Sequence, residues 1–137
     1  MPENKPTFPV KVAVYGTLKA HGSNHGLIKE SKFLGTGETD GIFNMLSMGS
    51  YPCAVSGTNK LEVEVYDVSA DTLQQLDWLE GHPSFYRREP VIIRMDSGES
   101  EYVEALMYTL RHIGTYNQYT HPPITNTTDT GALSWPV

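Results

Sequence analysis

The sequence has a single cysteine, Cys53, in 137 residues. One cysteine excludes an intramolecular disulfide framework and a cluster of thiolate metal ligands, because both need several. Basic residues are also few: 10 Lys and Arg stand against 16 Asp and Glu, and the formal net charge is −6. This charge balance argues against a sequence-general nucleic-acid binder and against a basic helix that lies on a membrane.

Long apolar runs are absent as well. No stretch approaches the roughly 20 residues that a membrane-spanning helix needs. Residues 1–6 lack the apolar region of a secretory signal. We therefore expect no membrane partner and a cytoplasmic location. The five histidines do not show the spacing of metal ligands on one helix, so we expect no metal and no other cofactor.

The sequence is rich instead in turn residues, with 12 Gly and 9 Pro. This composition predicts short elements rather than a helix bundle. A helix is expected at 72–80, beginning after Ser69 as its N-cap and ending at Gly81, and a short helix at 25–30. Strands are expected at 10–15, 33–39, 42–48, 61–68, 88–95 and 102–110. This order predicts an α+β protein built on a curved or closed sheet.

The length suits one domain over residues 1–137. Its core is expected within about residues 10–112. Residues 114–137 are rich in Thr, Asn, Gly and Pro and have few aliphatic side chains. Such a segment cannot build a core, so residues 113–137 are expected to wrap the surface or to be mobile.

A carboxylate falls on the apolar face of the predicted helix 72–80. At about 100° per residue, an apolar stripe forms from Leu73, Leu76 and Leu79, and Glu80 lies within that stripe. Burial and the negative end of the helix dipole both raise the pKa of such a carboxyl group, as a general base near neutral pH requires. The alternative is a helix that frays at Glu80 and turns the side chain to solvent. Asp77, at the edge of the stripe, is expected to be solvated or to cap the turn.

A glycine ends the first predicted strand, in the run Tyr15-Gly16-Thr17-Leu18-Lys19. Glycine lets a ligand approach the main chain closely, and successive amides after such a turn can form a site for an anion. The spacing matches neither a Walker A loop nor a dinucleotide fingerprint, so a carboxylate is a better guest than a phosphate. The alternative is a plain tight turn.

Several segments together resemble the γ-glutamylcyclotransferase-like family, and its γ-glutamylamine cyclotransferase branch with AIG2-like proteins above all. The resemblance covers about residues 10–112. In chain order, the segments that carry it are Val14 to Lys19, Asn24-His25, Gly49 to Pro52, Val63 to Val68, Leu76 to Gly81, Phe85 to Arg88, and Met107-Tyr108. One departure is Val63, where the family commonly has glycine.

The resemblance implies a small mixed β-barrel with flanking short helices and a single pocket. It implies that Glu80 is the catalytic acid and base, and that backbone amides hold the α-carboxylate of the substrate. Tyr15 is expected to contribute mainly its backbone. Tyr86 and Tyr108 either border the pocket and bond the substrate or are half-buried aromatic residues of the sheet. The substrate-binding residues expected are thus Tyr15, Gly16, Thr17, Leu18, Tyr86 and Tyr108.

The implied reaction is an intramolecular aminolysis by an enzyme of the acyltransferase or lyase type. The α-amine of a small γ-glutamyl substrate attacks its own γ-carbonyl, which forms 5-oxoproline and releases an amine. The alternative is a non-catalytic module that binds a carboxylate ligand on the same fold. A further alternative is an enzyme that removes a γ-glutamyl protecting group from a biosynthetic intermediate. The sequence carries no signal for the leaving amine or for the oligomeric state.

Overall fold

The computed structural model of the chain describes residues 8–96, 101–113 and 121–136. Its strands are β1 (Val10–Val14), β2 (Lys32–Thr39), β3 (Phe43–Ser47), β4 (Pro52–Ser56), β5 (Glu62–Val68), β6 (Arg87–Met95) and β7 (Tyr102–Thr109). The α-helix is α1 (Ala70–Glu80), and two 3-10 turns are η1 (His25–Leu27) and η2 (Arg111–Ile113). The predicted α+β class is confirmed.

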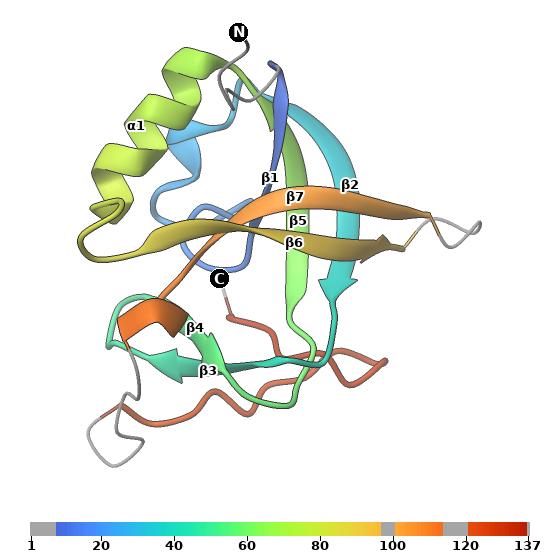
Figure 1. Cartoon of the computed structure of the whole chain (residues 1–137). Helices are drawn as coiled ribbons and strands as arrows, with labels where there is room; N and C mark the ends of the chain where they lie inside the picture. The colour runs from blue at the N-terminus through green and yellow to red at the C-terminus, as the bar shows by residue number, and fades with distance from the viewer. Residues whose placement is uncertain (1–7, 97–100, 114–120, 137) are drawn as a thin grey trace, which may run out of the picture.

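Five strands form a closed barrel in the order β1-β5-β2-β6-β7. Neighbours within this order are antiparallel, and a parallel pairing of β1 with β7 at Val12 and Leu106 closes the barrel. β3 and β4 form a separate antiparallel pair. In Figure 1, α1 lies near one end of the barrel, and β3 and β4 lie at the other. The small mixed barrel implied by the family resemblance is therefore confirmed.

β5 shows why alternation in the sequence predicts a strand of this barrel. Val63 and Val65 are fully buried, whereas Glu62 and Glu64 between and beside them are half-buried and point to the other face. Val63, at the position where the family commonly has glycine, thus packs in the core. β2 interrupts the regular pairing with a register shift between Phe33 and Gly35.

The caps of α1 follow the predicted residues. The Ser69 hydroxyl accepts a hydrogen bond from the Thr72 amide at 3.2 Å, which satisfies a free donor of the first turn. Gly81 has a left-handed backbone with φ of 69°, and its N–H donates to the carbonyls of Asp77 and Trp78. This end fixes where the helix stops, immediately after Glu80.

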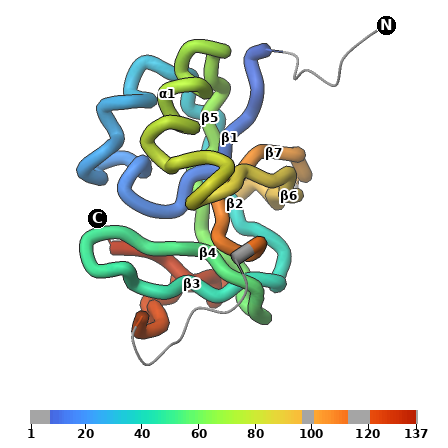
Figure 2. Tube along the Cα trace, turned by 60° about the vertical axis from the view of Figure 1, so that its left-hand side comes forward, coloured from blue at the N-terminus to red at the C-terminus, as the bar shows by residue number. Residues whose placement is uncertain are grey.

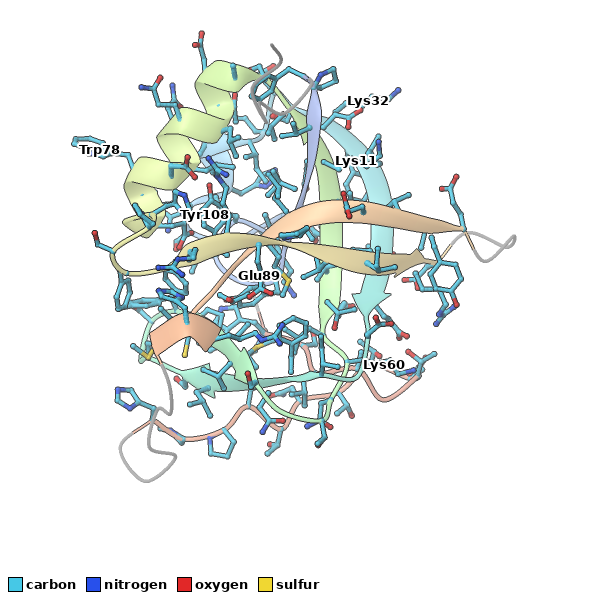
Figure 3. The ribbon with its side chains drawn as sticks, in the orientation of Figure 1. Lys11, Lys32, Lys60, Trp78, Glu89 and Tyr108 are labelled. Atoms are coloured by element: carbon cyan, nitrogen blue, oxygen red, sulfur yellow. The ribbon has the colours of Figure 1, made fainter. Side chains whose placement is uncertain are left out.

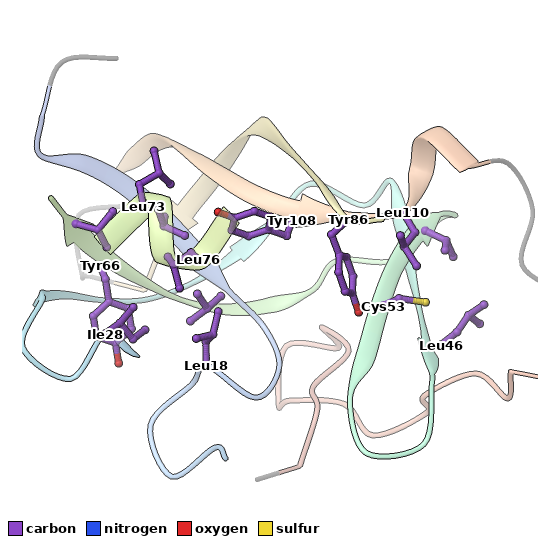
Figure 4. Packing of buried hydrophobic residues seen from close by; sticks show 14 residues of the cluster. Leu18, Ile28, Leu46, Cys53, Tyr66, Leu73, Leu76, Tyr86, Tyr108 and Leu110 are labelled. Carbon is purple, nitrogen blue, oxygen red and sulfur yellow. The ribbon is translucent and has the colours of Figure 1, made fainter. Parts of the chain in front are cut away.

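The buried face of α1 is narrower than predicted. Leu73 and Leu76 are buried in the core (Figure 4). Leu79, which helical periodicity places on the same stripe, is 43% exposed. Because the helix ends at Gly81, its last turn reaches past the core and Leu79 lies at a cavity instead. Trp78 is 91% exposed and points away from the molecule (Figure 3).

The C-terminal segment, residues 121–136, runs beside β3, as Figure 2 shows in red. The Ile124 amide donates to the Met45 carbonyl, and Leu133 pairs with Leu61. Ala132 and Leu133 are buried, and Leu133 belongs to a core cluster with Val63 and Val65. The described part of the tail runs over the barrel and the β3–β4 pair, and it adds Leu133 to a core cluster that the other strands build.

Two other expectations differ from the structure or fall outside it. The helix expected at 25–30 is only the 3-10 turn η1. The loop joining β6 to β7 and residues 114–120 lie mostly outside the described residues. In the described ranges, no helix has the length and apolar character needed to cross a membrane.

Candidate active site

A cavity of about 360 Å³ lies between the end of β1, the loop before β4 and the end of α1. All seven residues expected at the site line this cavity. They are Tyr15, Gly16, Thr17, Leu18, Glu80, Tyr86 and Tyr108. The lining also includes residues that were not predicted for the site, among them Asn24, Tyr51, Leu79 and Phe85. All four lie in segments that carry the family resemblance, which was the available signal, but no local spacing marks them as site residues.

We call residues 16–18 the amide turn. Their three backbone carbonyls accept hydrogen bonds, whereas their three backbone N–H groups donate none to other described residues. The Gly16 carbonyl accepts from the Lys19 amide at 3.0 Å, and the Thr17 carbonyl accepts from the Asn24 amide at 2.9 Å. The Leu18 carbonyl lies 2.9 Å from His25 Nδ1, which donates to it. Within the described residues, none of the three amides of the turn has an acceptor. Three successive free donors at a cavity wall can hold an anion.

Close contact with the loop before β4 explains the glycine at position 16. A Cβ atom there would lie 2.8 Å from Cγ and Cδ of Pro52. Those atoms belong to a ring tied to its own backbone, so they cannot rotate away. Glycine therefore lets the amide turn and the Pro52 loop form two adjoining walls of the cavity.

Glu80 occupies the last residue of α1 and lines the cavity. Its carbonyl accepts from the Tyr86 amide at 3.1 Å, so the helix does not fray at this residue. Burial raises the pKa of the Glu80 carboxyl from 4.5 to about 7. No hydrogen bond or ion pair from the described residues reaches this carboxylate. Burial thus brings the pKa of Glu80 toward neutrality, and the carboxylate has no partner in the described part of the chain that would hinder proton exchange with a ligand.

The three tyrosines predicted for the site have their hydroxyls bound by protein groups. The Tyr15 hydroxyl donates to the Tyr108 carbonyl at 2.8 Å and accepts from the Ala54 amide at 2.9 Å. The Tyr86 hydroxyl donates to the Pro52 carbonyl at 2.7 Å. Burial, with a smaller contribution from nearby Glu80, raises the pKa of each phenol. These tyrosines are therefore neutral, fixed walls, and their hydroxyls are not free donors to a substrate.

Tyr108 leads to a polar cluster that the sequence analysis missed. Its hydroxyl donates to Asp77 Oδ1 at 2.6 Å, and Arg88 donates to both oxygens of Asp77 at 2.8 and 3.0 Å. Burial opposes ionisation of Asp77, but the bonds from Arg88 and Tyr108 outweigh it and lower the pKa of this carboxyl. The expectation of a solvated or turn-capping Asp77 is wrong. A usable signal was its place in the last turn, where the helix dipole disfavours an unpaired negative charge.

Replacing Asp77 by Asn is expected to lower the free energy of unfolding by about 1–3 kcal/mol, because Arg88 and Tyr108 lose a charged acceptor. Urea denaturation at pH 7 measures the loss. Asp71→Asn is the matched control, since Asp71 is exposed in the first turn of the same helix. It should cost less than about 1 kcal/mol. Equal losses in both variants would show that the cluster carries no special stability.

The barrel, with its cavity at the end of β1, matches a known protein family. The family model described as "Gamma-glutamyl cyclotransferase, AIG2-like" matches residues 12–129, and the chain belongs to this family. A protein of Methanocaldococcus jannaschii named "Putative gamma-glutamylcyclotransferase" is 39% identical over 99 residues, which cover 71% of this chain and 81% of that protein.

Solved structures share the fold. An AIG2-like protein of Mus musculus has a TM-score of 0.75 at 23% identity and covers 96% of this chain and 97% of its own. A Pyrococcus horikoshii protein, described as uncharacterized, has a TM-score of 0.58 at 33% identity and covers 74% of this chain and 77% of its own. The mouse protein matches nearly the full chain, so its similarity includes the C-terminal segment.

Proposed function

We propose that the protein is a γ-glutamyl cyclotransferase that releases 5-oxoproline and a free amine, with Glu80 as its acid and base. The observation that carries this proposal is the pairing of groups in one cavity. A carboxyl group with a pKa of about 7 and three amides without acceptors line the same 360 Å³ space. Membership of the family supplies the reaction type.

The reaction needs only these groups and the substrate. The amide turn binds the α-carboxylate of the γ-glutamyl group, which fixes the α-amine near the γ-carbonyl. Glu80 takes a proton from the α-ammonium, and the amine attacks the γ-carbon to form a C–N bond. The C–N bond to the γ-linked amine then breaks as Glu80 returns that proton to the leaving nitrogen. The attacking nitrogen gives up its second proton as the lactam forms, and the released amine takes it up and leaves as an ammonium ion. The nucleophile comes from the substrate, so the chain need not supply one.

The charge of the cavity bears on the leaving amine. Among the described residues that line it, Glu80 is the one charged side chain, and no Lys, Arg or His is present. A substrate with a second carboxylate beside its leaving nitrogen would place that carboxylate near the negative charge of Glu80, with no cationic side chain of the described lining to balance it. The apolar Leu79 and Phe85 at the cavity suit a hydrocarbon stem instead. We therefore favour γ-glutamylamines over γ-glutamyl derivatives of α-amino acids.

A carboxylate-binding module on the same fold remains the second candidate, because the free amides alone could hold a carboxylate. A pure binder, however, gains nothing from a second negative charge in its pocket. One assay separates the two. The protein is incubated with γ-glutamyl-ε-lysine, γ-glutamyl amino acids and glutathione, and 5-oxoproline is measured by mass spectrometry. We expect release from γ-glutamyl-ε-lysine above all; ligand-induced stabilisation without any release would support the binder.

Activity should rise with pH through about 7. Glu80 must be ionised to accept a proton, and its pKa is raised to about 7 by burial. We expect kcat/KM to increase about tenfold per pH unit below 7 and to level off above it. Initial rates between pH 5 and 8.5, with the active substrate, measure this profile. A flat profile across that range would contradict the role of Glu80 as the base.

A further inference from the structure

Lys19 follows the amide turn and is buried although it is charged. Its side chain is only 5% exposed. A buried ammonium is unfavourable unless protein groups replace water around it. Lys19 Nζ donates to the Trp135 carbonyl at 2.8 Å and lies 3.3 Å from Glu62 Oε1. One side chain thus joins the loop after β1 to the barrel and to the C-terminal segment.

The acceptors of Lys19 are themselves held in place. The Glu62 amide donates to the Leu133 carbonyl at 2.8 Å, and the Ser134 hydroxyl donates to Glu62 Oε1 at 2.7 Å. The C-terminal segment therefore reaches β5 through its backbone and a side chain. It meets Lys19 and Glu62 at one point on the outer face of the strand.

The next residue of the loop is fixed in the same way. The Ala20 amide donates to Glu64 Oε1 at 2.8 Å, and the Tyr66 hydroxyl donates to the same oxygen at 2.9 Å. Glu62 and Glu64 are successive residues on the outer face of β5. Lys19 and Ala20 are thus bound to two carboxylates whose spacing the strand sets.

These contacts act on the amide turn through the main chain. The Lys19 amide closes the turn by donating to the Gly16 carbonyl at 3.0 Å. The cavity lining includes neither Lys19 nor Glu62 nor Trp135. Any effect of Lys19 on a ligand must therefore pass through the position of the turn.

We propose that Lys19 is a positioning residue for substrate binding, and that the C-terminal segment supports the amide turn through the Trp135 carbonyl. The kinetic part of this inference rests on the proposed cyclotransferase activity. The anchoring itself does not, because it concerns the order of the loop. Without the ammonium, the turn is expected to lose its fixed position and its three amides their common direction.

The test compares Lys19→Met with wild type in two measurements. The first is kcat and KM for γ-glutamyl-ε-lysine. We expect kcat/KM to fall at least tenfold, mainly through KM, because a loosened turn binds the α-carboxylate poorly. The second is hydrogen exchange of the Lys19, Gly22 and Asn24 amides, which donate within the loop. Their exchange should be at least tenfold faster in the variant.

Two further variants separate positioning from general stability. Lys29→Met removes an exposed lysine from the same part of the chain and should change neither measurement. Lys19→Arg keeps the positive charge and should restore most of the loop protection. If Lys19→Met does not fold, Glu62→Gln replaces it: faster loop exchange supports the inference and unchanged exchange overturns it.

The outcomes distinguish this inference from the proposed function. Loop exchange in Lys19→Met equal to that of wild type overturns the inference, and so does a lower melting temperature with KM unchanged. If wild type releases no 5-oxoproline from any γ-glutamyl compound, the proposed function fails. The hydrogen exchange of the loop amides then tests the anchoring by itself. Faster exchange in Lys19→Met than in wild type supports anchoring by Lys19, and equal exchange rejects it.

Discussion

Replacing Glu80 by Gln is expected to lower kcat by a factor of about 10²–10⁴, the range that a general acid or base contributes. The amide has nearly the shape of the carboxyl group but cannot take a proton from the α-ammonium. Binding of substrate should change little, because the amide turn is untouched. Single-turnover release of 5-oxoproline measures the loss. Glu104→Gln, at an exposed position on β7, is the control and should keep wild-type activity.

The same variant should be more stable than wild type at high pH. Burial raises the pKa of Glu80 from 4.5 to about 7, so the folded protein holds this proton more tightly than the unfolded chain. The free energy of unfolding of wild type therefore falls as pH rises from about 4.5 to about 7. Gln has no proton to lose, so the free energy of unfolding of Glu80→Gln lacks this decrease. The difference in unfolding free energy between the variant and wild type should therefore be about 1–3 kcal/mol more favourable to the variant at pH 8 than at pH 4. Equal stability differences at both pH values would contradict the burial of the carboxylate.

Replacing Gly16 by Ala is expected to reduce kcat/KM by about 10- to 100-fold while the barrel still folds. The new methyl group would lie 2.8 Å from the ring of Pro52, so the amide turn and the Pro52 loop must move apart. A displacement of about 1 Å in a group that orients the substrate is enough for such a loss. Steady-state kinetics measure it, and circular dichroism confirms the fold.

Gly26→Ala is the matched control for this variant. Gly26 lies in η1 of the same connection, and a Cβ atom there would meet nothing within 4 Å. This substitution should leave kcat and KM within about twofold of wild type. If Gly16→Ala were as active as Gly26→Ala, the close approach of the amide turn to Pro52 would have no part in substrate binding.

Much of the fold was predictable because it depends on local patterns. Alternating residues identify β5. Ser69 and Gly81 are the caps of α1 as predicted, although the helix begins at Ala70, two residues before the expected start. The position of Glu80 toward the interior also follows from helical periodicity, since seven residues bring a side chain back near Leu73. The barrel does not follow from such patterns; the family resemblance implied a barrel, and its strand order was not predicted.

The rest depends on contacts between distant parts of the chain. Asp77 is 11 residues from Arg88 and 31 from Tyr108, so no local pattern shows that it is paired. The Tyr15 hydroxyl donates a hydrogen bond to the Tyr108 carbonyl, 93 residues away, and accepts one from the Ala54 amide, 39 residues away. The burial of Leu133 likewise depends on its meeting Leu61. Such pairs exist only once the barrel has closed.

The pairing of Val12 with Leu106 also means that the barrel cannot close during synthesis before β7 has been made. The amide turn leaves the ribosome early and Glu80 later, but the strand that joins β1 on its far side is the last of the barrel. Nascent chains that end before β7 therefore carry both halves of the site on an unclosed sheet with free edges. Until β7 pairs with β1 and β6, such free edges can pair with other chains.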